Sequence, residues 1–323
     1  MHPLTEVISN LLVLAARHAR WVLIGGLALG LLFQGVAALA RPSIPVFIGL
    51  LLLMASFRIG PAGLTRARSQ LGTPIQLTLL SQLLLPLVLM VVIAGFGWSG
   101  IYITALLLVV AAAPISGSPN LVIMLGHEPA AALRQLVVGT ALLPLTLIPV
   151  LLFLPGMGNV FAVAIAAAKL LAVILCAAVV GLLLRKHPRF EQLSDVQIQQ
   201  VDGVSAILMA LVVVGLMSAI SDAFSHSPAQ LLLLLAFAFA VNIGLQMLGS
   251  LVWGRCYGQE YDVPMSVISG NRNIALYLTA LPVAVTEPLL AFVGCYQFPM
   301  YMTPLLMRRF YRGGISSSRE KVD

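Results

Sequence analysis

Two short polar segments interrupt long apolar stretches of this chain. Residues 116–120 read Ser-Gly-Ser-Pro-Asn and residues 269–273 read Ser-Gly-Asn-Arg-Asn, so both follow the pattern Ser-Gly-x-x-Asn. The two final Asn residues are separated by close to half of the 323-residue chain. Hydroxyl and amide side chains can ligate an ion or a small molecule, or they can pair with backbone groups freed by a broken helix. Two interrupted apolar segments at matching places in two halves are typical of a transporter built from a repeat.

Arg272 is the most informative residue of the two segments. A central membrane Arg costs about 2.5–3.5 kcal/mol on insertion scales, so it should face the protein interior or a water-filled path. One interpretation is that backbone carbonyls of a broken helix satisfy it, and the other, which we favour, is that it is an anion-binding or charge-compensating residue. Pro119 lacks an N–H, and Gly117 and Gly270 permit unusual torsions, so we expect each segment to break its helix. The candidate substrate-binding or coupling residues here are Ser116, Ser118, Asn120, Ser269, Asn271, Arg272 and Asn273.

Composition indicates a membrane protein. Hydrophobic residues make up 60% of the chain and charged residues 9%, and the length allows about ten spans of about 20 residues with short loops. The net charge of +7 does not indicate nucleic-acid binding, because no basic stretch is interleaved with aromatic residues. The three Cys residues form no metal-binding pattern, and no HExxH or GxSxG motif is present, so neither a metal site nor an enzyme is expected.

The distribution of charge predicts the topology. We expect spans at 21–40, 43–58, 73–95, 101–125, 130–154, 160–184, 201–220, 229–252, 263–284 and 286–307. Of the 18 Lys and Arg residues, 15 fall on the side shared by the two termini, and the opposite loops hold only Arg41. This asymmetry predicts that both termini lie in the cytoplasm. We therefore expect a multi-pass protein of the inner (plasma) membrane. His127, in the loop after the fourth span, is expected to be a solvated loop residue, and no carboxylate falls at a midplane position.

The expected fold is an all-α integral membrane protein of ten transmembrane helices. Five spans in each half force the halves into opposite orientations, which makes them inverted repeats with the broken helices at the fourth and ninth spans. The predicted segments are an N-terminal, interfacial helix at 1–20, the first repeat at 21–155, the second at 156–307 and a basic cytoplasmic tail at 308–323.

At these residues the chain resembles a divergent, bacterial-type member of the bile acid:sodium symporter family. The family's fourth span has a Gly-rich turn before Ser-Asn, where this chain has Gly117-Ser118-Pro119-Asn120. Its ninth span reads Glu-x-Gly-x-Gln-Asn, where residues 268–273 read Ile-Ser-Gly-Asn-Arg-Asn. Its third span has Gln, three apolar residues and Pro, and residues 82–86 of this chain read Gln-Leu-Leu-Leu-Pro. Its tenth span often has a polar pair, and residues 296–297 read Tyr-Gln. The resemblance therefore adds Gln82 and Gln297 to the candidate site.

The departures from the family concern its sodium ligands. Ile268 replaces a sodium-ligating Glu of the family, and Arg272 replaces a ligating Gln. Pro119 replaces the family's Ser before Asn120. A further ligating Ser aligns with Arg134. We therefore expect that Arg272, together with Arg134, replaces bound sodium electrostatically, so that transport does not couple to sodium through the usual sites.

The resemblance implies a panel domain of spans one, two, six and seven, and a core domain of the other six. It also implies a secondary transporter that moves a small organic anion by alternating access, with the substrate in the crevice between the two domains. The alternative is a non-transporting membrane receptor or partner-binding scaffold that keeps the symporter fold. Apart from that anion, the only partner expected is the lipid bilayer, and no cofactor is expected.

Overall fold

The computed structural model describes residues 3–68, 71–188, 190 and 192–311. Within these ranges the secondary structure is helical throughout, and no strand is present. One isolated β-bridge joins Pro114 to Arg272. The all-α fold expected from the sequence is therefore confirmed.

Among the described residues, seven helical segments are long and apolar enough to cross a membrane. They coincide with the predicted spans at 43–58, 73–95, 130–154, 160–184, 201–220, 229–252 and 286–307. The bounds of the seven segments are Gln34–Pro61, Gly72–Phe96, Ala130–Phe153, Val160–Arg185, Asp195–His226, Pro228–Tyr257 and Val283–Leu306. The chain is accordingly a multi-pass helical membrane protein.

The first span differs from its prediction. Instead of one helix over 21–40, helix α2 (Ala19–Leu32) ends at Phe33, whose φ of −118° and ψ of 76° are not helical. Helix α3 (Gln34–Ala40) then leads through η1 (Arg41–Ser43) into α4 (Ile44–Arg68). On the other side, α1 (Pro3–Arg17) meets α2 at an angle of 89°. Hydropathy does not record such a change of direction, because both sides of Phe33 are equally apolar.

The fourth and ninth predicted spans are interrupted at the two polar segments. Helix α7 (Ile101–Ala111) is separated from α8 (Ser118–Met124) by residues 112–117. Helix α14 (Gln259–Gly270) is separated from the 3₁₀ helix η3 (Ile274–Thr279) by residues 271–273. The expected helix breaks at these two places are therefore confirmed.

The chain forms two compact units, and each combines segments from both halves of the sequence. Unit 1 contains residues 1–70, 155–231 and 275–294, and unit 2 contains residues 71–154, 232–274 and 295–323. The predicted repeat boundary near residue 155 is thus also a boundary between units, although neither unit is a single repeat. Of the predicted tail at 308–323, residues 312–323 lie outside the described ranges.

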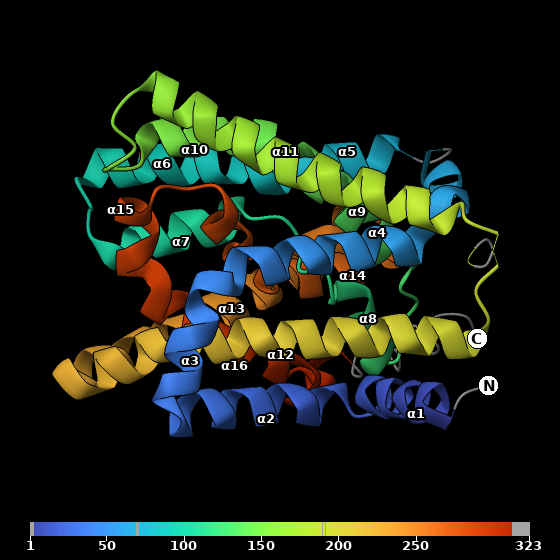
Figure 1. The fold of residues 1–323 in the computed structure, drawn as a ribbon. Helices are drawn as coiled ribbons and strands as arrows, with labels where there is room; N and C mark the ends of the chain where they lie inside the picture. Colours follow the sequence, from blue (N-terminus) through green and yellow to red (C-terminus); the bar gives the residue numbers. More distant parts are fainter. Residues whose placement is uncertain (1–2, 69–70, 189, 191, 312–323) are drawn as a thin grey trace. The chain divides into compact units, whose positions relative to one another are not determined.

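Helix α12 (Asp195–His226) is the centre of unit 1 and packs against α1, α2 and α4 (Figure 1). A capping box starts it: Ser194 Oγ accepts a hydrogen bond from Gln197 N–H, and the Ser194 N–H donates to Gln197 Oε1 at 2.9 Å. Near this end, Arg58 of α4 pairs with Asp202 at 2.7 Å. Helix α11 (Val160–Arg185) covers another part of α4. The predicted interfacial helix α1 is joined to α12 by a 2.7 Å hydrogen bond between Gln200 and Ser9.

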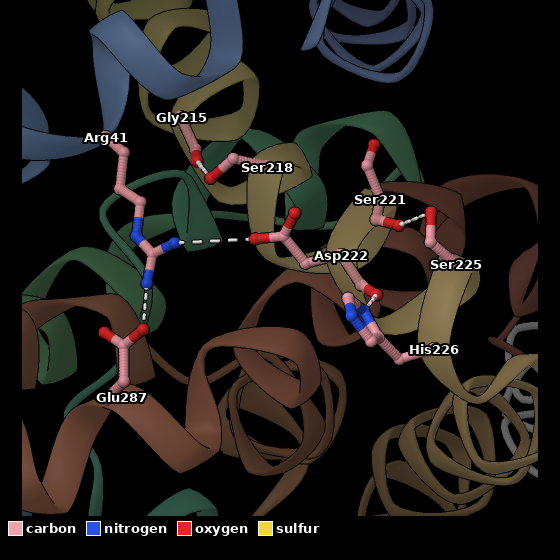
Figure 2. A network of polar contacts seen from close by, with 8 residues as sticks. All are labelled: Arg41, Gly215, Ser218, Ser221, Asp222, Ser225, His226 and Glu287. Carbon is pink, nitrogen blue, oxygen red and sulfur yellow. Dashed lines mark hydrogen bonds and ion pairs between the residues drawn. The ribbon is translucent and has the colours of Figure 1, made fainter.

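An ion cluster lies at the other end of α12. Figure 2 shows Arg41 between the carboxylates of Asp222, at 3.8 Å, and of Glu287. Glu287 begins the 3₁₀ turn η4 (Glu287–Leu289), which follows α15 (Val283–Thr286). Unit 1 therefore joins its three chain segments by an ion pair at each end of α12.

Unit 2 contains both helix breaks, with helices α7, α8 and α14. Its other elements are α5 (Gly72–Thr78), the π-helical η2 (Leu79–Leu84), α6 (Leu85–Phe96), α9 (Ala130–Thr146), α10 (Ile148–Phe153), most of α13 (Pro228–Tyr257) and α16 (Leu290–Leu306) from Cys295 onward. Buried apolar side chains of α5, α8, α9 and α14 form one core, which includes Leu77, Val122, Ala132, Met265 and Ile268. Ile268 is fully buried there, at the position where the resembled family has a charged ligand.

The capping box of α12 provides a test of the fold. Replacing Ser194 by Ala leaves N-terminal N–H groups of α12 without their partner and should cost about 1 kcal/mol. We expect a lower melting temperature for Ser194→Ala in detergent, measured by tryptophan fluorescence. Ser194→Asp, which keeps a capping oxygen, should melt close to the wild type, and equal losses for both variants would contradict the capping role.

Candidate functional site

The two polar segments meet in unit 2 and pair through their backbones. The Ile115 N–H donates to Asn271 O at 3.0 Å, and the Asn273 N–H donates to Ala113 O at 2.8 Å. Pro114 and Arg272 lie opposite each other between these two bonds. Backbone groups freed by a broken helix cannot stay unpaired in hydrocarbon, and here each break satisfies part of the other. The structure therefore brings together two segments that are far apart in the sequence, and we call this place the crossing.

Pro114, rather than the predicted Pro119, lies where α7 ends. It has no N–H to continue the helical ladder, and Ala112 before it is extended, with a ψ of 152°. Pro119 lies instead in the first turn of α8, where a missing N–H costs little. The expected role of the two glycines is also corrected. Gly117 has an ordinary φ of −82°, and neither Gly117 nor Gly270 adopts a positive φ.

Gly270 is required for space, not for its torsions. A Cβ on Gly270 would lie 2.1 Å from the carbonyl oxygen of Asn242 and 2.6 Å from Cγ of Gln246. The end of α14 therefore lies directly against α13. In the same way, a Cβ on Gly139 of α9 would lie 2.5 Å from Nε2 of Gln82 and 2.8 Å from Cδ of Pro114. Two glycines thus allow neighbouring helices to reach the crossing.

Arg272 is buried at the crossing with 2% of its surface exposed. Its Nη1 donates to Ala112 O at 2.9 Å and its Nε donates to Ser269 O at 3.3 Å. Ala112 caps the C-terminus of α7, and Ser269 is in the last turn of α14. Helix C-termini carry partial negative charge, so the guanidinium lies where two such ends meet. This contact agrees with the interpretation in which carbonyls satisfy the Arg, and it also compensates charge.

A buried polar network holds the end of α14. Asn242 donates to Gly270 O, and Gln246 Nε2 donates to Asn242 Oδ1 at 2.8 Å and to Thr303 Oγ at 3.2 Å. Thr303 in turn donates to Asn271 Oδ1 at 3.0 Å. Asn242, Gln246 and Thr303 are functional-site candidates that were not predicted from the sequence. Asn242 and Gln246 stand one helical turn apart within an apolar span, and that spacing was the signal for them.

Two of the predicted ligand residues belong to this scaffold. Asn271 is fully buried, accepts from Thr303 and donates to Val267 O at 2.7 Å. Ser269 donates to Met265 O at 2.8 Å and accepts from Trp253 Nε1 at 2.9 Å. These contacts use the polar atoms of both side chains. Both residues therefore support the helix end in this structure.

The other predicted residues divide into buried and accessible ones. Gln82 in η2 and Ser118 are buried, and within the described residues neither amide atom of Gln82 nor the Ser118 hydroxyl has a hydrogen-bond partner. Gln297 is also buried, next to Tyr296, whose hydroxyl donates to Gly270 O at 2.7 Å. The accessible predicted residues at the crossing are Ser116 and Asn273, which are partly buried, and Asn120, which is exposed.

Arg134 lies away from the crossing. It forms an ion pair with Glu260 in the first turn of α14 and lies over the ring of Tyr261, 5.9 Å from the ring centroid. The 12 residues of α14 span about 18 Å, and Arg272 follows their opposite end. The structure therefore does not bring Arg134 to Arg272.

Comparison with protein-family models and with curated proteins gives no match to this chain. The fold and the site define the class of the protein. It is a multi-pass helical membrane protein in which two interrupted helices pair through their backbones around a buried Arg.

The close contact at Gly270 is testable. Gly270→Ala forces the end of α14 away from α13, and overpacking of this kind costs about 1–3 kcal/mol. We expect a clearly lower melting temperature in detergent. Gly244→Ala, in α13 and with no atom within 4 Å of the new Cβ, is the matched control and should melt at or above the wild-type temperature. Equal behaviour of the two variants would contradict the contact.

Proposed function

We propose that the protein is a secondary transporter that moves a small organic anion by alternating access. The observation that carries the proposal is the pairing of two interrupted helices around the buried guanidinium of Arg272. Irregular backbone at membrane depth occurs where it is buried in protein or lines a cavity, and in transporters such places hold the substrate and coupling ions. The place of the two breaks in the two halves of the chain supports the inverted repeat of ten spans.

The ion pairs support the proposed topology. Arg41, Asp222 and Glu287 all fall in or beside loops that the ten-span arrangement places outside the cell (Figure 2). Arg58 with Asp202, and Arg134 with Glu260, join positions that it places on the cytoplasmic side. Each pair therefore links residues assigned to one face, as a correct span count requires.

The division into two compact units supports the panel and core domains. Unit 1 holds the spans expected in the panel, at 21–40, 43–58, 160–184 and 201–220. Unit 2 holds the core spans at 73–95, 101–125, 130–154 and nearly all of 229–252. The ninth and tenth spans are divided, because residues 275–294 belong to unit 1. The crossing itself belongs to unit 2, the core.

Arg272 replaces a bound cation in this proposal. Each helix C-terminus carries about half of a negative elementary charge, so one guanidinium offsets the ends of both α7 and α14. In other transporters, half-helix ends and unwound carbonyls coordinate sodium or protons. A fixed positive charge at that place lets an anion approach without a bound sodium ion. Ser116, Asn120 and Asn273 are the accessible polar side chains for the substrate.

Replacement of Arg272 tests this role. Arg272→Gln removes a charged donor to Ala112 O and Ser269 O, and hydrogen bonds to charged groups are worth about 1.5–3 kcal/mol. We expect a lower melting temperature that sodium chloride raises more than choline chloride does, because a cation can again bind the two helix ends. The wild type should melt at the same temperature in both salts. Arg134→Gln loses the same charge about 18 Å away and should show no preference for sodium.

Transport itself is tested in proteoliposomes with labelled cholate, pyruvate and pantoate as probes. We expect uptake of at least one probe that a sodium gradient does not accelerate, and that Asn273→Ala abolishes. Steep sodium dependence in the wild type would contradict the replacement of sodium by Arg272. Saturable binding of a probe without flux or exchange would favour the receptor instead.

A further inference from the structure

Two titratable side chains outside the crossing have buried atoms that lack partners. Oδ1 of Asp262 and Nε2 of His127 are both shielded from solvent, and within the described residues neither atom has a hydrogen-bond partner. The two groups interact electrostatically. A buried polar atom without a partner costs about 1–3 kcal/mol, so the arrangement calls for a further proton donor. His127 was expected to be a solvated loop residue; it lies in the loop after α8 and is partly exposed, but its Nε2 is shielded from solvent.

Neighbouring elements cover one side of the partly buried Asp262 side chain. It is in the first turn of α14, and on α13 it faces Gly254, where a Cβ would lie 2.7 Å from its Cγ. His127 follows α8, and Tyr311 follows α16. Three loops that the predicted topology places on the cytoplasmic side therefore contribute to one cluster, which we call the Asp262 cluster: Asp262, His127 and Tyr311.

Within the described residues, no charged group near the Asp262 cluster forms a salt bridge with the Asp262 carboxyl. Glu260, two residues earlier on α14, is paired with Arg134 of α9. The cations on the neighbouring elements are Arg255 of α13, and Arg308 and Arg309 before Tyr311, and all three are exposed. No group of three or more His, Cys, Asp or Glu residues in the described chain could hold a metal ion. The chemistry of the cluster therefore suits a proton better than a metal ion.

The electrostatics agree with a proton as the ligand. Asp262 precedes the predicted span at 263–284, and burial raises the pKa of its carboxyl above the ordinary value, although the charge of His127 lowers it in part. Burial also raises the pKa of the Tyr311 phenol, and the negative charge of Asp262 raises it further. Tyr311 therefore remains a hydrogen-bond donor, and Asp262 is the acid that gains a proton as the pH falls.

Hydrogen bonds connect the Asp262 cluster to the crossing. The Tyr311 hydroxyl donates to Gln246 Oε1 at 3.2 Å. Gln246 donates to Asn242 and Thr303, and these two residues hold Gly270 O and Asn271 at the end of α14. Helix α14 joins the same two places directly, since Asp262 is near its beginning and Arg272 follows its end. The charge of Asp262 acts electrostatically on Tyr311, and Tyr311 is hydrogen-bonded to the network that holds the end of α14.

We propose that Asp262 is a proton-binding site, supported by His127 and Tyr311, and that its protonation is coupled to transport of the anion. The step is the formation of one O–H bond at the carboxylate with a proton from water, and release reverses it. This inference rests on the proposed transport function and names its coupling ion. A proton moving with a monovalent anion carries no net charge, so a pH gradient drives the transport and a membrane potential does not.

The first test needs no substrate. A carboxyl whose pKa is raised by folding takes up its proton in the folded state before the unfolded state does, so its protonation stabilises the fold as the pH falls through the raised value. We expect the melting temperature of the wild type, relative to that of Asp262→Asn, to increase as the pH is lowered from neutral towards the ordinary pKa of a carboxyl. Glu128→Gln, which removes an exposed carboxylate beside His127, should follow the wild type. Parallel curves for wild type and Asp262→Asn would overturn the proton site.

The second test measures coupling in sodium-free proteoliposomes with labelled pyruvate, cholate and pantoate. An acidic exterior should raise the initial uptake rate of a transported probe several-fold over the rate at equal pH, beyond the leak into protein-free vesicles. For Asp262→Asn this ratio should be close to one, while counterflow of the probe remains detectable. Glu128→Gln should keep the wild-type ratio.

The outcomes separate the two proposals. Counterflow in the wild type without any response to the pH gradient would overturn proton coupling and leave the transport function standing. Absence of both uptake and counterflow for every probe, in protein that the melting curves show to be folded, would overturn transport and its coupling together. A gradient response that Asp262→Asn retains would overturn the assignment of the site to Asp262.

Discussion

The structure of unit 2 depends on one constraint: a backbone group freed from a helix in the membrane must find a partner within the protein. Helices α7 and α14 both stop inside apolar sequence, and their freed groups pair across the crossing at Ile115 with Asn271 and at Asn273 with Ala113. Two further carbonyls, Ala112 O and Ser269 O, accept from Arg272. The buried guanidinium and the ends of the broken helices therefore provide hydrogen-bond partners for each other.

The same constraint explains the scaffold around the crossing. Gly270 and Gly139 bring α13 and α9 close, and Asn242, Gln246 and Thr303 supply donors and acceptors to the end of α14. A polar network of this kind rigidifies a protein when its members are satisfied. Gln82 and Ser118 differ, because their buried atoms lack partners in the described residues. The crossing thus combines a hydrogen-bonded framework with neighbouring buried polar atoms that have no partner among the described residues.

The proposed function follows from how charge is distributed over this framework. One guanidinium offsets two helix ends, so the crossing has no need of a bound cation, and an anion is the charge that it would attract or tolerate. The sequence departs from the resembled family at just these positions, with Ile268 and Arg272 in place of ligands. With sodium replaced, a proton at Asp262 is the coupling ion that we propose, because Asp262 lies near the beginning of α14 and Arg272 follows the end of that helix.

The sequence by itself determined the membrane class, seven of the ten predicted spans and the two places where helices break, because hydropathy and the polar interruptions of apolar runs are local properties. It also singled out Arg272, since a charge inside an apolar run is visible without a structure. Only the tertiary structure decided that the breaks pair with each other, that Ser269 and Asn271 support the scaffold, and that Arg134 lies at the far end of α14. Those facts depend on which distant segments touch, and neither spacing nor composition records contacts between α7, α13, α14 and α16.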